Sequence, residues 1–206
     1  MSLTVAYPLI VLIGYLLGSL NLAMLFAKLK GVDIRAGGSG NPGTSNALTL
    51  MGWKIGVLVG AHDIGKGILA VWLCTKIFPT VPYVGAAAGV SCVLGHIYPF
   101  YMGFRGGKGF AAYLGMTLAL NWRFALGLLV AIVLLVLITD YIVVGTMTTV
   151  VSFPVFCAIN HHYAVALLLC VASLIIIYKH RANLIRIANG TEIKVLASAK
   201  GKYRVK

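Results

Sequence analysis

Most of the chain consists of long apolar runs separated by short polar segments. The first run, residues 3–27, carries no charged side chain and exceeds the roughly 20 residues that a helix needs to cross the hydrocarbon core of a bilayer. The other long runs are residues 48–78, 83–101, 124–139, 141–159 and 163–178. This pattern predicts an all-α integral membrane protein in which each run forms a transmembrane helix.

A further apolar segment, residues 110–120, is short, because a helix of this length covers only about 17 Å at 1.5 Å per residue. If it continued as one bent helix into residues 124–139, the chain would have six spans and its basic tail would lie outside the cell. Basic residues gather on the cytoplasmic side of membrane proteins, which disfavours six spans. We therefore predict seven transmembrane helices, with the short one sheltered by protein or placed where the bilayer thins.

Seven spans place the N-terminus outside and the C-terminus in the cytoplasm. The loop that ends at residue 46, the loop at residues 103–109 and the tail then share the cytoplasmic side, and only Lys76 and Arg123 remain outside. We expect a single transmembrane domain over residues 1–206, with a basic cytoplasmic tail at 179–206.

Composition agrees with a membrane location. Of the 206 residues, 60% are hydrophobic and 10% are charged, and the mean hydropathy is +0.97. Soluble domains carry about 25% charged residues. The formal net charge of +13, from 17 Lys and Arg against 4 Asp and Glu, suits cytoplasmic loops, contact with anionic membrane lipids and anionic substrates. Nucleic acid is not an expected partner, since no part of the chain forms a basic soluble domain.

The segment GSGNPGTSN, residues 38–46, is the first candidate for chemistry. Glycine allows backbone N–H groups to turn toward a ligand at positive φ, and successive N–H groups arranged in this way bind anions. The same residue types also form ordinary surface turns between helices, so a simple turn remains the alternative. Asn46 is in addition a candidate cap for the helix that follows. The candidate binding residues are Gly38, Ser39, Gly40, Asn41, Gly43, Thr44, Ser45 and Asn46.

The segment GFRGGKG, residues 103–109, is the second candidate. It places Arg105 and Lys108 among glycines that include Gly106, Gly107 and Gly109. Two cations on flexible backbone are suited to binding phosphate. The alternative is a glycine-rich turn with two positive-inside anchors, which would explain the charges but not the density of glycine.

The segment GSGNPG also matches the spacing GxGxxG of dinucleotide-binding proteins. That fingerprint requires a preceding β-strand, whereas a transmembrane helix and a polar loop come before it here. Thr44 stands where a phosphate-binding P-loop would carry lysine. The chain also shows no Ser-His-Asp or Cys-His set and no metal-ligand cluster. We therefore expect no cofactor and no metal, and group transfer by positioning and electrostatics.

Charged and titratable residues also occur inside the predicted spans. Asp63 and Lys66 lie three residues apart, on one face of a helix. Charges at this depth are costly and usually functional, although simple mutual pairing is the alternative. His96 closes the third span just before residues 103–109, and is either a structural hydrogen-bonding residue or a catalytic one.

The segment HRANLIRIANGTE, residues 180–192, follows the last span. His180, Arg181, Asn183 and Glu192 would meet the cytoplasmic face there, and a solvated tail is the alternative. Three polar clusters then share one membrane face. Such a site suits a water-soluble phosphorylated substrate that meets a lipid-borne one.

These segments resemble the signatures of the bacterial acyl-phosphate:glycerol-3-phosphate acyltransferases of the PlsY type. GSGNPGTSN is similar to that family's usual GSGNPGATN, and Asp63 with Lys66-Gly67 resembles its D-x-x-K-G. GHIYPFYMGFRGGKG, residues 95–109, and residues 180–192 resemble its second and third signatures. The resemblance covers nearly the whole chain in order. It implies seven transmembrane helices and transfer of a fatty acyl group from acyl phosphate to the 1-hydroxyl of glycerol 3-phosphate, giving lysophosphatidic acid and phosphate.

The resemblance also implies roles for individual residues. Residues 39–46 and the glycines at 103–109 would bind phosphate, and Lys108 would hold the substrate phosphate and stabilise developing charge. His180, Asn183 and His96 would orient glycerol 3-phosphate, and the phosphate of the donor would act as the base. The candidate catalytic residues are Lys108, Ser39 and His96. We expect a monomer in the bacterial cytoplasmic membrane, with its active site on the cytoplasmic face and neither acyl-CoA nor acyl carrier protein as donor.

One position departs from the family pattern. The family usually carries arginine three residues after the end of its first signature, and Thr49 stands there in this chain. Another cation, Lys54 or Arg35, would then have to serve. Two other functions remain open: a transporter for an organic phosphate, in which Asp63 and Lys66 mark the pathway, and a paralogue without activity. No half-span repeat of the kind found in transporters is visible.

Overall fold

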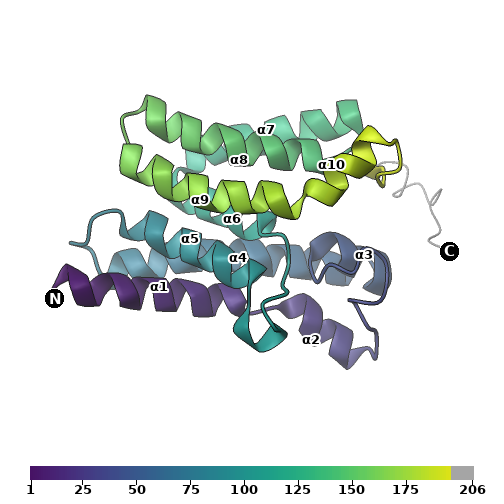
Figure 1. Cartoon of the computed structure of the whole chain (residues 1–206), viewed down its shortest axis with the longest axis horizontal. Coiled ribbons are helices and arrows are strands. Elements are labelled where there is room, and N and C mark those ends of the chain that lie inside the picture. Colours follow the sequence, from purple (N-terminus) through teal and green to yellow (C-terminus); the bar gives the residue numbers. More distant parts are fainter. Residues whose placement is uncertain (196–206) are drawn as a thin grey trace. The chain divides into compact units, whose positions relative to one another are not determined.

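The regular elements of the computed structural model, which describes residues 1–195, are all helices (Figure 1). The predicted basic tail positions Lys200, Lys202, Arg204 and Lys206 lie outside these residues. The chain divides into two compact units, residues 1–120 and the part that begins at Asn121. The all-α prediction is confirmed.

The first unit contains six α-helices and one short 3-10 helix within its described residues. They are α1 Leu3–Ser19, α2 Leu22–Leu29, α3 Thr44–Met51, α4 Trp53–Ile77, α5 Val84–Ile97, η1 Phe100–Met102 and α6 Phe110–Leu120. Helices α1, α4 and α5 pack on one another, α6 packs on α4 and α5, and α3 packs on α4.

Small residues allow α1 and α5 to approach closely. Gly14 and Gly18 lie one turn apart on α1, and a Cβ atom at either would overlap a backbone carbonyl of α5, that of Ala88 or Cys92. Gly95 of α5 meets the α1 backbone at Tyr15 in the same way. Lipid tails are as apolar as side chains, so helices in a membrane associate through such close packing.

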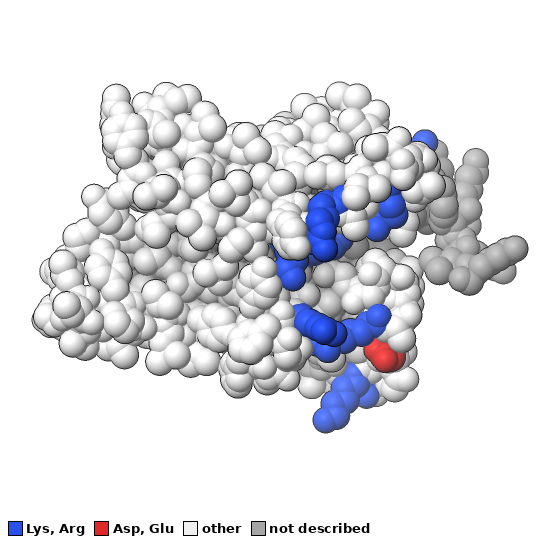
Figure 2. Space-filling view, in the orientation of Figure 1, with Lys and Arg blue, Asp and Glu red and all other residues white. Residues whose placement is uncertain are grey.

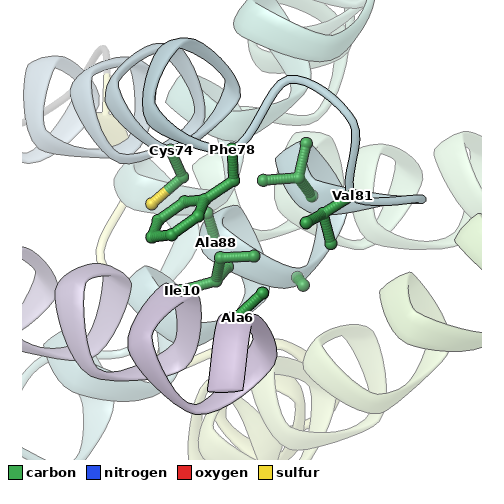
Figure 3. Packing of buried hydrophobic residues seen from close by; sticks show 8 residues of the cluster. Ala6, Ile10, Cys74, Phe78, Val81 and Ala88 are labelled. Atoms are coloured by element: carbon green, nitrogen blue, oxygen red, sulfur yellow. The ribbon is translucent and has the colours of Figure 1, made fainter. Parts of the chain in front are cut away.

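At the N-terminal end of α1 this packing includes an apolar cluster. Ala6 and Ile10 of α1 meet Cys74 of α4 and Ala88 of α5, with Phe78 beside them (Figure 3). The turn between α4 and α5 adds Val81, and the Tyr7 hydroxyl donates a hydrogen bond to the Pro82 carbonyl at 2.8 Å. These contacts fix the lengthwise position of α1 against α4 and α5.

Two of the predicted spans are interrupted. Residues 3–27 form two helices, because the chain breaks at Leu20 and the Asn21 side chain caps α2 by accepting from the Met24 N–H at 2.9 Å. Residues 48–78 are not continuous either, since Gly52 adopts φ 90° and separates α3 from α4. The sequence did not predict these breaks, because both lie inside apolar sequence, although Leu3–Leu29 still counts as one candidate span by length and composition.

The short helix α6 begins and ends at the predicted residues and is sheltered by protein. Tyr113, Met116 and Thr117 are fully buried, and α4 and α5 cover the helix. Gly67 of α4 lies against the Ala112 carbonyl, and Gly115 of α6 lies against the Ile64 carbonyl. Of the two alternatives given for this segment, shelter by protein and a thinned bilayer, the first is what the structure shows.

This α4–α6 contact gives a matched pair of variants. A methyl group at Gly67 would overlap the α6 backbone, whereas a methyl group at Gly65, two residues earlier on α4, meets no atom within 4 Å. Overpacking costs about 1–3 kcal/mol, so Gly67→Ala should lower the thermal unfolding midpoint in detergent by several degrees. Gly65→Ala should leave it unchanged or raise it, and equal midpoints for the two variants would contradict this packing.

The second unit contains α7 Trp122–Thr139, α8 Ile142–Ile159, α9 Tyr163–Lys179 and α10 Arg181–Ala188. Helix α8 packs on both α7 and α9, and the rings of Phe124, Phe153 and Phe156 stack between α7 and α8. Helix α10 turns away from α9 by 50°.

By length and composition, five helical segments of residues 1–195 could cross a membrane, and a sixth if α9 and α10 count as one bent span. The five are Leu3–Leu29, Trp53–Ile77, Val84–Met102, Trp122–Thr139 and Ile142–Ile159. Helix α6 falls below this length. In the first unit, Figure 2 shows Lys and Arg side chains where α2 lies, whereas the visible surface over α1 is white.

Candidate active site

The first glycine-rich loop is built around the side chain of Asn46. Its oxygen accepts from the Ser39 N–H at 2.9 Å, and its amide donates to the carbonyls of Ile34 at 2.8 Å and Gly37 at 3.1 Å. Gly38 and Gly40 turn the loop at φ 59° and 68°. Asn46 therefore shapes the loop, and its side-chain atoms are occupied within it.

The prediction that Asn46 caps the following helix was wrong. Helix α3 begins at Thr44 with Gly43 as its N-cap, so Asn46 lies within the first turn and its side chain points back into the loop. Glycine provides no capping oxygen, which leaves the first N–H groups of α3 available to an anion. Ser39 and Ser45 are exposed beside them, and Asn41 and Thr44 are half-buried.

Asn46 gives a second testable prediction. Asn46→Asp preserves the shape but places a carboxylate, which cannot donate, against two carbonyls. Each buried group left without its partner costs about 1–3 kcal/mol, so the variant should unfold several degrees below the wild type and bind substrate weakly. The matched control is Thr49→Ala on the same helix, which removes an exposed hydroxyl that bonds only within the helix, to the Ser45 carbonyl at 3.0 Å. Equal unfolding midpoints for the two variants in detergent would contradict the role of Asn46.

The second glycine-rich loop folds back onto the C-terminal end of α5. The Gly106 N–H donates to the Ile97 carbonyl at 2.9 Å, and the Gly107 N–H donates to the His96 carbonyl at 3.1 Å. A Cβ atom at Gly106, Gly107 or Gly109 would overlap residues 96 or 97. Close packing thus explains the glycine density, which the sequence alone had attributed to ligand binding.

The two cations of this loop differ in position. Arg105 is exposed, whereas Lys108 is half-buried and lies just before α6, whose first backbone hydrogen bond runs from the Tyr113 N–H to the Gly109 carbonyl at 2.9 Å. The N-terminal end of a helix carries a partial positive charge. Lys108 at the start of α6 therefore adds a full positive charge to an end that already attracts anions.

A buried ionic network joins α4 to α5 beneath this loop. The Lys66 ammonium donates to an Asp63 carboxylate oxygen at 2.9 Å, to His96 Nδ1 at 2.8 Å and to the Leu20 carbonyl at 2.7 Å. Three acceptors match the three N–H groups of the ammonium. Mutual pairing of Asp63 and Lys66, the simpler of the two interpretations, is what the structure shows, and His62 lies at the edge of the network with Nδ1 at 3.4 Å from Asp63.

The network fixes the tautomer of His96. An ammonium can only donate, so Nδ1 accepts from Lys66 and the ring proton of the neutral imidazole lies on Nε2. The ring is 4% exposed, and a Cβ atom at Gly107 would meet the edge that carries Nε2. His96 thus presents an N–H donor against the backbone of the second loop.

Two further contacts bring the loops together around the α1–α2 break. The Asn21 amide donates to the Pro42 carbonyl of the first loop at 3.1 Å, and the Leu20 carbonyl next to it is the Lys66 partner. The Arg35 guanidinium donates to the carbonyls of Met102 at 3.1 Å and Arg105 at 3.0 Å. The structure therefore gathers both loops, Asp63, Lys66 and His96 within the first unit.

Sequence reasoning missed the parts played by Asn21 and Arg35. Asn21 was visible as the one amide side chain in an otherwise apolar run, and Arg35 as a charge close to the first glycine-rich segment. Arg35 and Lys54 were suggested to replace the arginine that the family usually carries at the position of Thr49. The Arg35 guanidinium is hydrogen-bonded to the carbonyls of Met102 and Arg105. The Lys54 ammonium lies 5.9 Å from the centroid of the Trp53 ring.

The third predicted cluster lies in the second unit, and the solvated-tail alternative is wrong for three of its residues. His180, Asn183 and Glu192 are buried. His180 Nδ1 donates to the Ile176 carbonyl at 2.8 Å. Glu192 receives hydrogen bonds from Asn183 at 2.8 Å and Arg186 at 2.7 Å, so its carboxylate fastens the segment after α10 onto that helix.

Arg181 differs from these three residues. Its guanidinium lies over the Tyr178 ring, 4.2 Å from the centroid, and donates to the Tyr178 carbonyl at 3.2 Å. It is exposed. Within this cluster, Glu192 and Arg181 therefore have structural partners of their own.

Known proteins match this chain over nearly its whole length. The family model described as glycerol-3-phosphate acyltransferase matches residues 8–190. The glycerol-3-phosphate acyltransferase of Clostridioides difficile is 37% identical over 195 residues, which are 92% of this chain and 96% of that protein. The protein of the same name from Aquifex aeolicus is 36% identical over 184 residues, 89% of this chain and 96% of that protein.

Solved structures agree with these relatives. The crystal structure of PlsY (YgiH), an integral membrane glycerol 3-phosphate acyltransferase, in its glycerol 3-phosphate form matches with a TM-score of 0.85 and 35% identity, over 91% of this chain and 94% of that one. Its lysophosphatidic acid form matches with a TM-score of 0.82 and 34% identity, over 92% and 96% of the two chains.

Proposed function

The chain belongs to the glycerol-3-phosphate acyltransferase family, and we propose that it takes its acyl group from an acyl phosphate and transfers it to the 1-hydroxyl of glycerol 3-phosphate. The chain is an integral membrane acyltransferase of phospholipid synthesis. The products of the proposed reaction are lysophosphatidic acid and inorganic phosphate, and neither acyl-CoA nor acyl carrier protein takes part.

The observation that carries the donor proposal is the pair of glycine-rich loops. Each loop leads into the N-terminal end of a helix, α3 after residues 38–43 and α6 after residues 103–109, and Arg35 holds the two loops together. Helix N-termini bind phosphate groups. Two such ends suit a reaction in which donor and acceptor each carry a phosphate.

In the proposed reaction the 1-hydroxyl oxygen attacks the acyl carbon and the bond from that carbon to the phosphate oxygen breaks. The hydroxyl proton passes to the departing phosphate, so no side-chain base is required. Lys108 holds phosphate and stabilises the negative charge that develops. Ser39 and the N–H of His96 Nε2 supply further donors, and the network of Lys66 and Asp63 keeps that histidine tautomer in place.

Residues 180–192 have a role in binding the acceptor substrate in the proposed reaction. His180 and Asn183 orient glycerol 3-phosphate. Glu192 supports this role indirectly, because its carboxylate accepts from Asn183 and so fixes the orientation of that amide.

We also propose seven membrane spans in a monomer, with the N-terminus outside and the site on the cytoplasmic face of the bacterial inner membrane. The seventh span is α6, and its cover by α4 and α5 supports crossing by a helix too short to face lipid alone. The exposed basic residues Lys28 and Lys30 lie at the C-terminal end of the first span, as the positive-inside rule expects of a cytoplasmic end.

Purified protein in lipid nanodiscs tests the donor. Acyl phosphate with glycerol 3-phosphate should yield lysophosphatidic acid and phosphate in equal amounts, whereas acyl-CoA and acyl carrier protein should yield neither. Uptake of labelled glycerol 3-phosphate into liposomes without phosphate release would instead indicate a transporter. The observation that favoured transport, a charged pair inside a span, is accounted for by the mutual pairing of Asp63 and Lys66.

A further inference from the structure

One side chain, that of Arg35, connects the segment before the first glycine-rich loop to the second loop. It belongs to the segment before the first loop, and its Nη2 donates to the carbonyl of Met102, the last residue of η1, at 3.1 Å and to the carbonyl of Arg105 in the second loop at 3.0 Å. A guanidinium NH₂ group carries two N–H donors and can therefore donate to both carbonyls at once. The contact thus ties the segment before the first loop to two points of the backbone at 102–105.

The backbone that carries Arg35 is fixed on both sides. The Asp33 carboxylate accepts from the N–H groups of Arg35 at 2.9 Å and Ala36 at 3.2 Å. On the other side, Asn46 holds the Ile34 carbonyl, and the Ile34 side chain is buried. The guanidinium is thus anchored to the same hydrogen-bonded framework that shapes the first loop.

The backbone between the two carbonyls that accept hydrogen bonds from Arg35 is strained. Gly103 and Phe104, which lie between its two carbonyl partners, adopt φ 63° and 58°. The left-handed region is uncommon for a bulky residue such as Phe104, and such conformations persist only where the surroundings hold them. The Phe104 side chain is exposed and does not hold itself in place by burial, so the hydrogen bonds from Arg35 are the contact that holds this turn from the first loop.

We propose that Arg35 is a positioning residue that sets the separation of the two loops, and with it the separation of the two phosphate groups in the reaction. The proposal rests on the proposed function, in which each loop holds a phosphate. Reacting groups must be placed closely, and a displacement of about 1 Å can reduce a rate by roughly 10²-fold. Loss of the two hydrogen bonds should therefore slow transfer without unfolding the helices.

The test compares Arg35→Ala with Lys30→Ala. Lys30 is also an exposed cation near the first loop, and its side chain makes no hydrogen bond or ion pair among residues 1–195, so it controls for loss of charge. Hydrogen–deuterium exchange of the substrate-free protein measures the exchange rates of the N–H groups of Phe104, Gly106 and Gly107. These groups donate hydrogen bonds to backbone carbonyls of residues 96–99. Two lost hydrogen bonds should speed their exchange by roughly tenfold or more in Arg35→Ala, with α4 unchanged.

Kinetics in nanodiscs complete the test. The kcat of Arg35→Ala should fall roughly 10- to 100-fold with a much smaller change in KM for glycerol 3-phosphate, Arg35→Lys should recover part of the loss, and Lys30→Ala should match the wild type. A fall in rate with unchanged loop exchange would mean that Arg35 contacts substrate directly, and it would overturn the proposal. Faster exchange with an unchanged rate would overturn it too. If the wild type does not use acyl phosphate, the proposed donor fails, whereas the exchange comparison still decides whether Arg35 holds the loop.

Discussion

Lys66→Met should destabilise the protein strongly. It leaves the Asp63 carboxylate, His96 Nδ1 and the Leu20 carbonyl buried without their donor. Breaking a buried ion pair by removing one partner costs about 3–5 kcal/mol, because the remaining charge is uncompensated. We expect the thermal unfolding midpoint in detergent to fall by roughly 10 °C or more, with loss of activity.

Two controls separate the network from a general effect of losing a lysine. Lys54→Met, on the same helix but exposed, should leave the midpoint unchanged. The double variant Asp63→Leu with Lys66→Met removes both charges and should recover most of the stability, since apolar replacements of a whole buried pair are often neutral. Its activity should stay low, because His96 no longer receives the hydrogen bond that fixes its tautomer. A single variant as stable as the wild type would contradict the network.

Lys108→Met should lower turnover strongly. Lys108 lies at the start of α6, where its charge adds to the positive end of the helix. Removal of one group that stabilises developing negative charge typically lowers kcat by about 10²–10³-fold. The measurement is lysophosphatidic acid formation in nanodiscs at saturating substrate.

The charge and the geometry of Lys108 can be tested separately. Lys108→Arg keeps the charge and should retain part of the rate, whereas Lys28→Met, an exposed lysine of α2, should retain all of it. An unchanged rate in Lys108→Met would remove this residue from the proposed catalytic set.

Hydropathy predicted the helical membrane fold and placed α6 at its observed residues. It could not find the breaks at Leu20 and Gly52, because each lies within apolar sequence and depends on a cap or on a backbone angle. The glycines at 106, 107 and 109 were correctly singled out but explained by ligand binding, whereas the structure shows that they pack against α5. That contact depends on how the loop folds back, which local sequence does not indicate.

For the site, the sequence identified individual residues but not the contacts between them. Asp63, Lys66 and His96 were each identified, since charges and histidines stand out in apolar runs, but their assembly around one ammonium depends on the packing of α4 against α5 and on the break after α1. Arg35 was named only as a substitute cation. Its partners, Met102 and Arg105, lie far along the chain, and only the folded structure brings them to it.

In the proposed reaction, the glycerol 3-phosphate hydroxyl attacks the acyl carbon of an acyl phosphate. A heavy-oxygen label in the bridging position, between the acyl carbon and phosphorus, tests it directly in purified protein with both substrates. Attack at the acyl carbon should send all of the label into the released phosphate and none into lysophosphatidic acid. Label recovered in free fatty acid, or phosphate released without lysophosphatidic acid, would contradict the account.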